Sequence, residues 1–399
     1  MCSCIFYRKD KANGNIIYIF IFVDDFIWTG NDSVTTLAGI EEYRKYAETT
    51  PTVVNPEKVL GFEMCRDREH HTITLSLVRK IEEMYDYLNT NKLIERYSIN
   101  ENRKIHVPLT SKDVLIGDTP FEGINAKEFL SQLCNASEIS EYLTLVGGIL
   151  WQLGVRWETL YGVSYLTWQT HKPRHHHLKC CVKLVIYLYQ TRFINKLVLG
   201  GKEKLEILTY TDMSLNTGPQ GRSIIAYGTK LGRKSGLVCG KTKATVDIVL
   251  SSFEGELEGV LVGSENNNNV AECVHNIGAI TEGFKNNASV VNIIIELGTF
   301  LEHRHVYSDN EAMINFVNGE GQGRGMKHAT LRLWYMRQQV DRGYTLEWLS
   351  GKIILANPMT KAVDRKEQFL HKQEVLGQLL LPIVEEVQEG EDGEDEDKA

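Results

Sequence analysis

The order of strands and helices expected after residue 205 constrains the fold of this chain more than any other feature. From Leu205 onward the sequence alternates as strand, strand, strand, helix, strand, helix, strand, helix, ending near Leu381. The pattern predicts a separate domain of strands and helices, with a boundary near Gly200-Gly201.

Three acidic positions in this domain fall where a strand ends or a helix begins. Asp212 ends the first expected strand, and Asp309 lies where the fourth gives way to a helix. Early in the intervening helix, Glu254 and Glu256 flank the apolar stripe on opposite sides, so periodicity leaves the choice between them open. Hydrolysis of phosphodiesters with two metal ions needs several carboxylates on one patch. We predict that both aspartates and one glutamate converge there.

A second acidic feature lies near the start of the chain. Asp24 and Asp25 join two apolar runs, residues 16–23 and 26–28, which are typical of the strands of a hairpin. Anions flanked by apolar side chains are costly to bury, and Mg²⁺ bound by carboxylate oxygens would compensate that cost. The alternative is a plain exposed turn, although such turns more often use Asn-Gly or Asp-Gly. The sequence favours the metal site.

The net charge of −8 is distributed unevenly along the chain. Residues 385–399 hold nine acidic residues and one lysine, so the remaining body is neutral. A neutral body excludes a global basic surface, and any nucleic-acid contact must come from a local stripe. The candidates for that stripe are Lys172, Arg174, Lys179 and Lys183. A solvated helix face is their simpler interpretation. We expect residues 382–399 to form a disordered acidic tail.

The sequence gives no indication of membrane insertion or of a zinc site. The longest apolar run near the start, residues 16–23, is far shorter than the roughly 20 residues of a membrane span, and no secretory leader is evident. We therefore expect an intracellular protein. The eight cysteines show no C-x-x-C spacing. His175-His176-His177 and Cys180-Cys181 stand on an expected helix, where adjacent side chains point to different faces, so we predict no metal there.

Two other patterns receive plain structural interpretations. Asn266–Asn269 and Asn286-Asn287 bracket a polar insertion, which we predict to be a long loop. Trp334, Tyr335 and Trp348 are interpreted as core aromatics rather than base-stacking platforms. We assign no function to either pattern.

Several short motifs occur in the order found in one known family. They are Phe22-Val23-Asp24-Asp25, Leu60-Gly61-Phe62-Glu63-Met64, Val146-Gly147-Gly148-Ile149-Leu150-Trp151, Tyr187-Leu188-Tyr189-Gln190-Thr191, Ser251-Ser252-Phe253-Glu254-Gly255-Glu256, Tyr307-Ser308-Asp309-Asn310, Met326-Lys327-His328 and Ala356-Asn357-Pro358-Met359-Thr360-Lys361. Over most of residues 4–364 the chain thereby resembles the C-terminal part of the Pol polyprotein of copia-type LTR retrotransposons. So many motifs in one order argue against chance similarity.

The resemblance implies an α+β chain with three parts and a tail. Residues 1–100 would form a partial right-hand reverse transcriptase palm and thumb, 101–200 a helical connection, and 201–381 an RNase H-like domain with a mixed sheet. It also implies an RNA-directed DNA polymerase family member with RNA–DNA hybrid ribonuclease activity and Mg²⁺ in a two-metal site. The implied partners are a hybrid or template-primer and other Pol segments, in a cytoplasmic particle or the nucleus.

The resemblance also assigns site residues. It favours Glu256 over Glu254 as the metal ligand beside Asp212 and Asp309, and it makes Asp24-Asp25 the metal ligands of the polymerase. A polymerase needs a third palm carboxylate, whereas the only acid before Asp24 is Asp10, in a polar turn. We therefore expect no DNA polymerisation by this chain.

One residue departs from the RNase H pattern. Asn357 stands where the family has its fourth metal-binding aspartate, and an amide offers an oxygen without a charge. The same residue could cap a helix that begins at Pro358. Asp364 lies about 10 Å further along such a helix, too far to replace the missing acid. The resemblance thus leaves two alternatives: a weakened hybrid ribonuclease, or a truncated, catalytically inactive remnant that at most binds nucleic acid.

Overall fold

The computed structural model describes residues 5–9, 14–114, 132–203, 206–249, 251–282, 304–319, 330–341 and 343–378. Several sequence features lie outside these residues. They are Asp10, Asn286-Asn287, Met326-Lys327-His328 and the acidic tail at 382–399.

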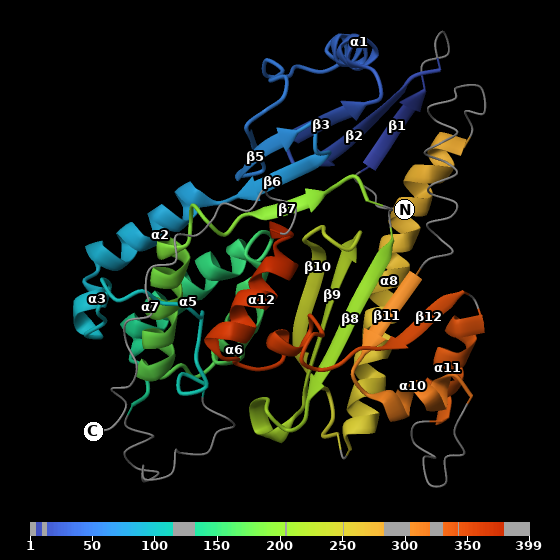
Figure 1. Cartoon of the computed structure of the whole chain (residues 1–399). Helices are drawn as coiled ribbons and strands as arrows, with labels where there is room; N and C mark the ends of the chain where they lie inside the picture. The colour runs from blue at the N-terminus through green and yellow to red at the C-terminus, as the bar shows by residue number, and fades with distance from the viewer. Residues whose placement is uncertain are drawn as a thin grey trace.

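A mixed five-stranded sheet forms the centre of the C-terminal half (Figure 1). Its strands are β8 (Ile207–Ser214), β9 (Ile224–Leu231), β10 (Leu237–Ala244), β11 (Arg304–Ser308) and β12 (Tyr344–Trp348). The order is β10-β9-β8-β11-β12, with β8, β9 and β10 antiparallel and β8, β11 and β12 parallel. The sheet is mixed, as the family resemblance implies, and is compatible with an RNase H-like domain.

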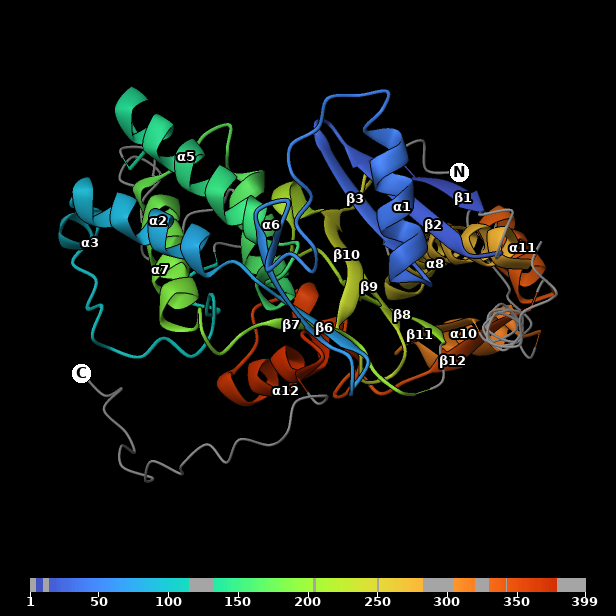
Figure 2. The same cartoon turned by 90° about the horizontal axis from the view of Figure 1, so that it is seen from above.

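Helices cover both faces of this sheet. They are α8 (Ser252–Glu282), α10 (Glu311–Val317), α11 (Thr330–Asp341) and α12 (Arg365–Val375). Successive residues of a strand point to opposite faces. Ile225 of β9 faces Gly259 of α8, whereas the next residue, Ala226, shares a hydrophobic cluster with Val375 of α12. Figures 1 and 2 accordingly show α8 and α12 on opposite sides of the sheet.

A stripe of glycines lets α8 approach β8 closely. Gly255, Gly259 and Gly263 recur at four-residue spacing, so they share one face of the helix. A Cβ atom on Gly263 would clash with the side chain of Thr211, and one on Gly255 would meet Met213. The stripe therefore fixes how near the start of α8 comes to the end of β8.

The asparagine-rich segment that the sequence predicts to be a loop is helical. Asn266–Asn269 lie inside α8 rather than in a loop. Sheet hydroxyls contact two of the amides: Thr229 Oγ1 donates to Asn266 Oδ1 at 2.8 Å, and Asn267 Nδ2 donates to Thr209 Oγ1 at 3.0 Å. Asn267 Oδ1 has no hydrogen-bond partner among the described residues. The low helix propensity of asparagine is thus overridden by tertiary hydrogen bonds.

A bundle of helices forms the middle of the chain. Its members are α2 (Val78–Thr90), α3 (Leu93–Arg96), α5 (Ala136–Gln152), η1 (Trp157–Thr159), α6 (Leu160–Trp168) and α7 (His175–Gln190). This confirms the helices expected within 142–168 and 178–189. Leu88, Tyr142, Leu166 and Val185 belong to one buried core. Leu160 instead joins the cluster of α12 and the five-stranded sheet. The division near residue 200 stays a prediction.

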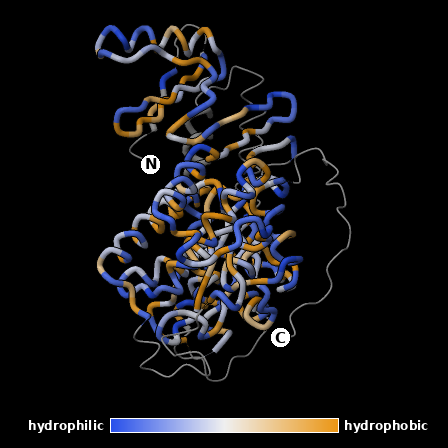
Figure 3. The backbone as a smooth tube through the Cα atoms, turned by 90° about the vertical axis from the view of Figure 1, so that its left-hand side faces the viewer, coloured by the Kyte–Doolittle hydropathy of each residue, from blue (hydrophilic) through white to orange (hydrophobic). Residues whose placement is uncertain are grey.

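Two smaller sheets complete the fold. One contains β1 (Ile5–Lys9), β2 (Ile16–Phe22) and β3 (Asp25–Gly30), followed by α1 (Ser33–Tyr43). The other contains β4 (Lys58–Val59), β5 (Phe62–Asp67), β6 (Thr72–Ser76) and β7 (Leu197–Gly200). In Figure 3 the first sheet and α1 project from the rest of the described chain. Their assignment to a polymerase palm and thumb stays a prediction.

No helix among the described residues combines the length and the apolar composition that a membrane crossing requires.

The glycine stripe leads to a testable contrast between two glycine-to-alanine variants. Gly147 is exposed in α5 with open space around it, so Gly147→Ala should raise the free energy of unfolding by about 0.5–1 kcal/mol. Gly263→Ala gains the same propensity but forces α8 away from Thr211, and we expect a net loss of about 1–3 kcal/mol. Urea unfolding of both variants measures the difference. Equal stabilisation by both would show that α8 does not depend on the stripe.

Candidate functional site

The register of two parallel strands brings Asp212 beside Asp309. β11 pairs with β8 from Arg304 opposite Ile207 to Tyr307 opposite Tyr210. Continuing that register by two residues aligns Asp309, directly after β11, with Asp212 near the end of β8. Thr211 supports this junction, because its hydroxyl donates to the carbonyl of Tyr307 at 3.0 Å.

Glu256 completes the cluster from the first turns of α8. One ligand oxygen from each of Asp212, Glu256 and Asp309 lies within 4.8 Å of the others. Asp212 and Glu256 are only 3% and 5% exposed, while Asp309 is half-buried. The structure thus brings together the three acids that the sequence analysis placed at strand and helix ends. Their role as metal ligands stays a prediction.

The alternative glutamate lies outside this cluster. Glu254 is half-buried, and its backbone N–H donates to Ser251 Oγ at 3.2 Å near the start of α8. It is two residues from Glu256, which is about 200° around a helix, so the two side chains point in different directions. Of the two glutamates, the geometry selects Glu256.

Burial and mutual repulsion govern the charge of the cluster. Burial raises the pKa of Asp212 to about 7, and the charge of Asp309 adds to this effect. Burial, followed by the charges of Asp212 and Asp309, raises the pKa of Glu256 to about 9. Burial also raises the pKa of Asp309. Within the described chain, no lysine or arginine forms a salt bridge with any of the three. The cluster therefore has no salt-bridge partner among the described residues.

Two hydroxyl groups orient the buried acids. Ser308 Oγ donates to Glu256 Oε2 at 3.2 Å, and Thr360 Oγ1 donates to Asp212 Oδ2. The charge of Lys361 lowers the pKa of Asp212 and Asp309, partly opposing the effect of burial. The sequence analysis quoted Thr360 and Lys361 within a motif without giving them a role. Their position next to Asn357 was the signal that could have identified them.

Asn357 does not cap a helix, contrary to one sequence interpretation. It is the first residue of the 3-10 helix η3 (Asn357–Met359), whose N-cap is Ala356. Its side chain instead contacts the first turn of α12, where Nδ2 donates to Glu367 Oε1 at 2.6 Å. The backbone carbonyl of Asn357 lies 2.9 Å from Thr360 Oγ1, the same hydroxyl that contacts Asp212. Asn357 is therefore linked to the acidic cluster through Thr360.

Asp364 has a structural role at the next helix. It is the N-cap of α12, and its Oδ1 accepts from the backbone N–H of Glu367 at 2.8 Å. This agrees with the expectation that Asp364 does not replace the missing acid, although the reason differs. The chain between Asn357 and Asp364 is a short 3-10 helix and a turn rather than one continuous helix.

Asp24 and Asp25 lie in the predicted hairpin but are exposed. Phe22 pairs with Asp25 across the turn, and Val23 adopts a positive φ of 53°. Both carboxylates face solvent, as does Val23, so the expected cost of burying them does not arise. Among the described residues, neither acid belongs to a group of three metal-ligating side chains. A polymerase metal site here stays a prediction without support from burial.

The four basic residues proposed for nucleic acid differ in their surroundings. Lys172 and Lys179 are exposed, whereas Arg174 and Lys183 are half-buried. Lys183 forms an ion pair with Asp113, which neutralises its charge. Only part of the proposed stripe therefore remains as exposed positive charge, and its contact with nucleic acid stays a prediction.

Two tryptophans interpreted as core residues are at the surface. Trp334 is 68% exposed and Trp348 is 51% exposed, and Tyr335, the third aromatic of the same prediction, is exposed as well. Trp348 lies at the end of β12, and its indole Nε1 donates to the carbonyl of Asp309 at 3.0 Å. The core prediction was wrong because an aromatic residue at the last position of a strand can lie beyond the helices that cover the sheet. Trp348 instead places an open aromatic face beside the cluster.

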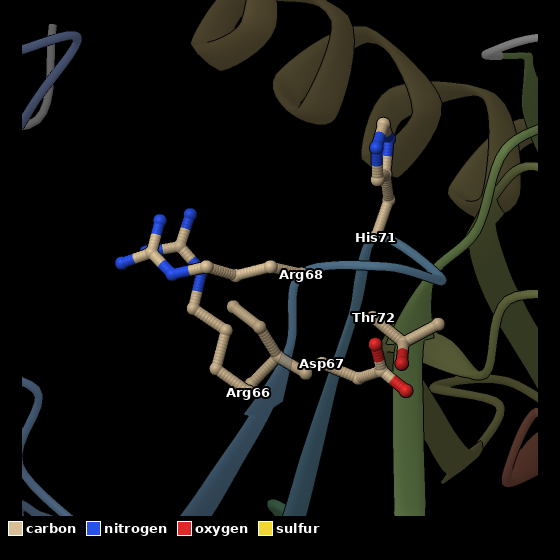
Figure 4. Close-up of a pocket in the computed structure, with 6 residues that line it drawn as sticks. Arg66, Asp67, Arg68, His71 and Thr72 are labelled. Carbon is tan, nitrogen blue, oxygen red and sulfur yellow. The ribbon is translucent and has the colours of Figure 1, made fainter.

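A hollow of about 360 Å³ lies elsewhere, on the β5–β6 hairpin. It is lined by Arg66, Asp67, Arg68, His71, Thr72 and Ile73. Figure 4 shows the side chains of Arg66 and Arg68 extending away from those of Asp67 and Thr72. None of the predicted site residues lines this hollow, so it takes no part in the acidic cluster.

Comparison with known proteins gives structural similarity alone. No protein-family model matches the chain, and no curated protein matches its sequence. The chain is similar to the N-terminal RNase H domain of Rv2228c from Mycobacterium tuberculosis, determined as a fusion with maltose binding protein, at 12% identity and a TM-score of 0.25. The similarity covers 42% of this chain and 97% of that one. Such a TM-score does not establish a shared fold, so the site has to stand on its own geometry.

The raised pKa values predict how stability responds to pH and divalent cations. The pKa of Glu256 is about 4 in the unfolded chain and about 9 in the folded protein. Between these two pH values the folded state binds more protons than the unfolded state, so the free energy of unfolding falls as pH rises. Each excess proton contributes a slope of about 1.4 kcal/mol per pH unit. We expect Mg²⁺ to raise the melting temperature at pH 8 but not at pH 5. An equal effect at both pH values would contradict this linkage.

Proposed function

We propose that the C-terminal half of this chain is a metal-dependent nuclease that cleaves the RNA strand of RNA–DNA hybrids. The observation that carries the proposal is the convergence of Asp212, Glu256 and Asp309 at the ends of β8 and β11 and the start of α8. Clustered carboxylates without a salt-bridge partner are the donor set that hard divalent cations prefer. A purely structural role would favour paired or neutral side chains at such buried positions.

The donor set fits Mg²⁺, which Asp212, Glu256 and Asp309 would hold. When bound, a pair of such ions stabilises the attacking and leaving oxygens of a phosphodiester. The protein supplies orientation: the hydroxyls of Ser308 and Thr360 fix the carboxylates of Glu256 and Asp212. Trp348 offers an aromatic face next to Asp309, against which a sugar or base of the substrate can pack.

We further propose that the chain derives from the Pol polyprotein of a copia-type LTR retrotransposon. The support is the motif order, with Asp24-Asp25 on a hairpin turn and the acidic cluster in the C-terminal sheet. On this proposal its partners are RNA–DNA hybrid or template-primer and other Pol segments, in a cytoplasmic particle or the nucleus. Polymerisation is not part of the proposed activity, because the two exposed aspartates have no third carboxylate beside them among the described residues.

A specific observation favours the second candidate function, an inactive remnant that at most binds nucleic acid. The Asn357 amide is held by Glu367 at 2.6 Å, so the side chain at the family's fourth acidic position is engaged elsewhere. On this alternative the cluster still binds a divalent cation, while the position that completes the site is neutral.

The test is cleavage of a hybrid with labelled RNA by the full chain, in Mg²⁺ and in Mn²⁺. Release of RNA fragments from the hybrid, but not from double-stranded DNA and not with chelator, supports the nuclease. Retained hybrid binding without release in either ion overturns it in favour of the remnant. Absence of both binding and release, with divalent cations failing to alter the melting temperature, excludes both functions.

A further inference from the structure

A second group of metal-ligating side chains lies far from the acidic cluster in sequence, at the start of two helices of the bundle. Cys134 precedes α5, Glu138 lies in the first turn of α5, and His175 is the first residue of α7. One ligand atom of each lies within 4.8 Å of the others. The sequence analysis considered His175 only with its neighbours in the chain, and so missed the partners that approach it from α5.

We propose that Cys134, Glu138 and His175 form a zinc site that ties the start of α5 to the start of α7. A thiolate, an imidazole and a carboxylate together suit zinc, whereas Mg²⁺ prefers oxygen ligands alone. Two ligands of a tetrahedral zinc ion lie about 3.3–3.8 Å apart, given metal–ligand distances of about 2.0–2.3 Å. His175 Nε2 already lies 3.3 Å from Glu138 Oε2.

The backbone around this group is fixed without a metal. Leu133 and Arg174 form an isolated antiparallel bridge. Cys134 N donates to the carbonyl of Pro173 at 3.1 Å, and His175 N donates to that of Gln132 at 3.0 Å. These bonds hold the two ligand-bearing segments together, so little chain entropy is lost when an ion binds.

Glu138 is held in place by a capping box at the start of α5. Asn135 Oδ1 accepts from the backbone N–H of Glu138 at 3.1 Å, while Glu138 Oε2 accepts from the backbone N–H of Asn135 at 2.9 Å. The carboxylate is thereby aimed toward His175, and it keeps lone pairs for a further partner. A glutamine at this position would keep the capping box but remove the charge.

Exposure provides a route for the ion. Cys134 is only 8% exposed and the Glu138 side chain 13%, whereas the His175 side chain is 48% exposed. An ion can therefore enter from the His175 side and keep an open position toward solvent. Binding breaks the S–H bond of Cys134 and releases its proton to the solvent, leaving the thiolate as the ligand.

A neighbouring tyrosine gives a second, independent indication. The hydroxyl of Tyr97 is buried and has no hydrogen-bond partner among the described residues. Tyr97 packs against the hydrophobic cluster that includes Cys134. Burial, followed by the charges of Glu138 and Cys134, raises the pKa of Tyr97 to about 12. Buried polar groups are almost always satisfied. A water bound at the open position of the ion would supply the missing partner.

No lysine or arginine of the described chain forms a salt bridge with Glu138, so its carboxylate can bind a metal ion. Glu141, one turn further along α5, is paired with Arg96 at 2.6 Å. The remaining partner of Glu138 is His175, so the competing interpretation is a simple ion pair between these two, with Cys134 as a buried thiol. The two interpretations differ in whether the thiol takes part.

The test uses Co²⁺ as a spectroscopic probe and Zn²⁺ in calorimetry, with the full chain and no nucleic acid. We expect one equivalent of Co²⁺ to give a thiolate-to-cobalt charge-transfer band, displaced by Zn²⁺. Cys134→Ser and His175→Gln should weaken Zn²⁺ binding at least about tenfold. The exposed residues Cys65 and His171 provide matched controls, and Cys65→Ser and His171→Gln should leave binding unchanged.

Either of two results would overturn the proposal: absence of the band in the parent chain, or an unchanged Zn²⁺ affinity in Cys134→Ser, as an ion pair alone requires. If Cys134→Ser fails to fold, Glu138→Gln takes its place, because it keeps the capping box while removing a ligand charge. Asp212→Asn should retain the band. The outcome is thus independent of the proposed nuclease, whose failure would leave Co²⁺ binding unaffected.

Discussion

Glu256→Gln is expected to reduce cleavage of the hybrid by roughly 10²–10³-fold, while Glu254→Gln leaves the rate within about twofold. Charge stabilisation by metal ions is worth several kcal/mol in the transition state, and each 1.36 kcal/mol is about tenfold in rate. Glutamine at position 256 keeps an acceptor for Ser308 Oγ but removes the anion from the cluster. Single-turnover cleavage of labelled RNA measures both variants, which differ by only two positions on one helix.

Stability measurements separate this role from a structural one. Because burial raises the pKa of Glu256 to about 9, the metal-free protein holds it protonated at pH 7, and glutamine is a close neutral substitute. We therefore expect an unchanged melting temperature without metal and a loss of the increase that Mg²⁺ produces at pH 8. Loss of activity in Glu254→Gln instead would identify Glu254, rather than Glu256, as the metal ligand. Unchanged cleavage in both variants would remove the acidic cluster from the mechanism.

Asp212 and Asp309 could be predicted to converge because each lies where a strand ends. β8 and β11 pair in parallel, and the carboxyl ends of parallel strands meet at one edge of the sheet. The order of the elements alone does not show that β11 pairs with β8 rather than with β10, which directly precedes α8. The apolar stripe does not determine which glutamate joins the two aspartates, because Glu254 and Glu256 fit the stripe equally well. The glycines at positions 255, 259 and 263 lie on the face of α8 that contacts β8. Their four-residue spacing is visible in the sequence and could have identified this face.

The remaining differences arise from contacts between residues that are distant along the chain. The Asn266–Asn269 run has the composition of a loop. Hydrogen bonds with distant residues, among them the hydroxyls of Thr209, Thr229 and Tyr344, make it compatible with a buried helix. Asn357 has the local pattern of a cap, and only Glu367 shows where its amide is used. Cys134 and His175 are 41 positions apart, and a backbone bridge brings their segments together. No local periodicity contains this information.

The second large effect is expected from substitution of Asn357, the neutral residue at the position where the family resemblance implies an aspartate. Asn357→Asp alone is expected to lower the free energy of unfolding by about 1–3 kcal/mol, because it replaces a donor with an anion beside Glu367. Combining it with Glu367→Gln restores the pair with donor and acceptor exchanged. It leaves one negative charge on the side chain of residue 357, whose backbone carbonyl accepts from the Thr360 hydroxyl that contacts Asp212. Urea unfolding should therefore show the double variant to be more stable than Asn357→Asp.

The same double variant should cleave the hybrid roughly 10–100-fold faster than the parent chain, since groups around a metal site typically change activity by that factor. Glu367→Gln alone is the matched control, and it should leave cleavage unchanged because Asn357 stays neutral. A parent chain without detectable cleavage and an active double variant would favour the remnant interpretation, with a single neutral residue accounting for the loss. If the double variant is stable but no faster than the parent, position 357 does not limit activity, and the three clustered acids alone determine the rate.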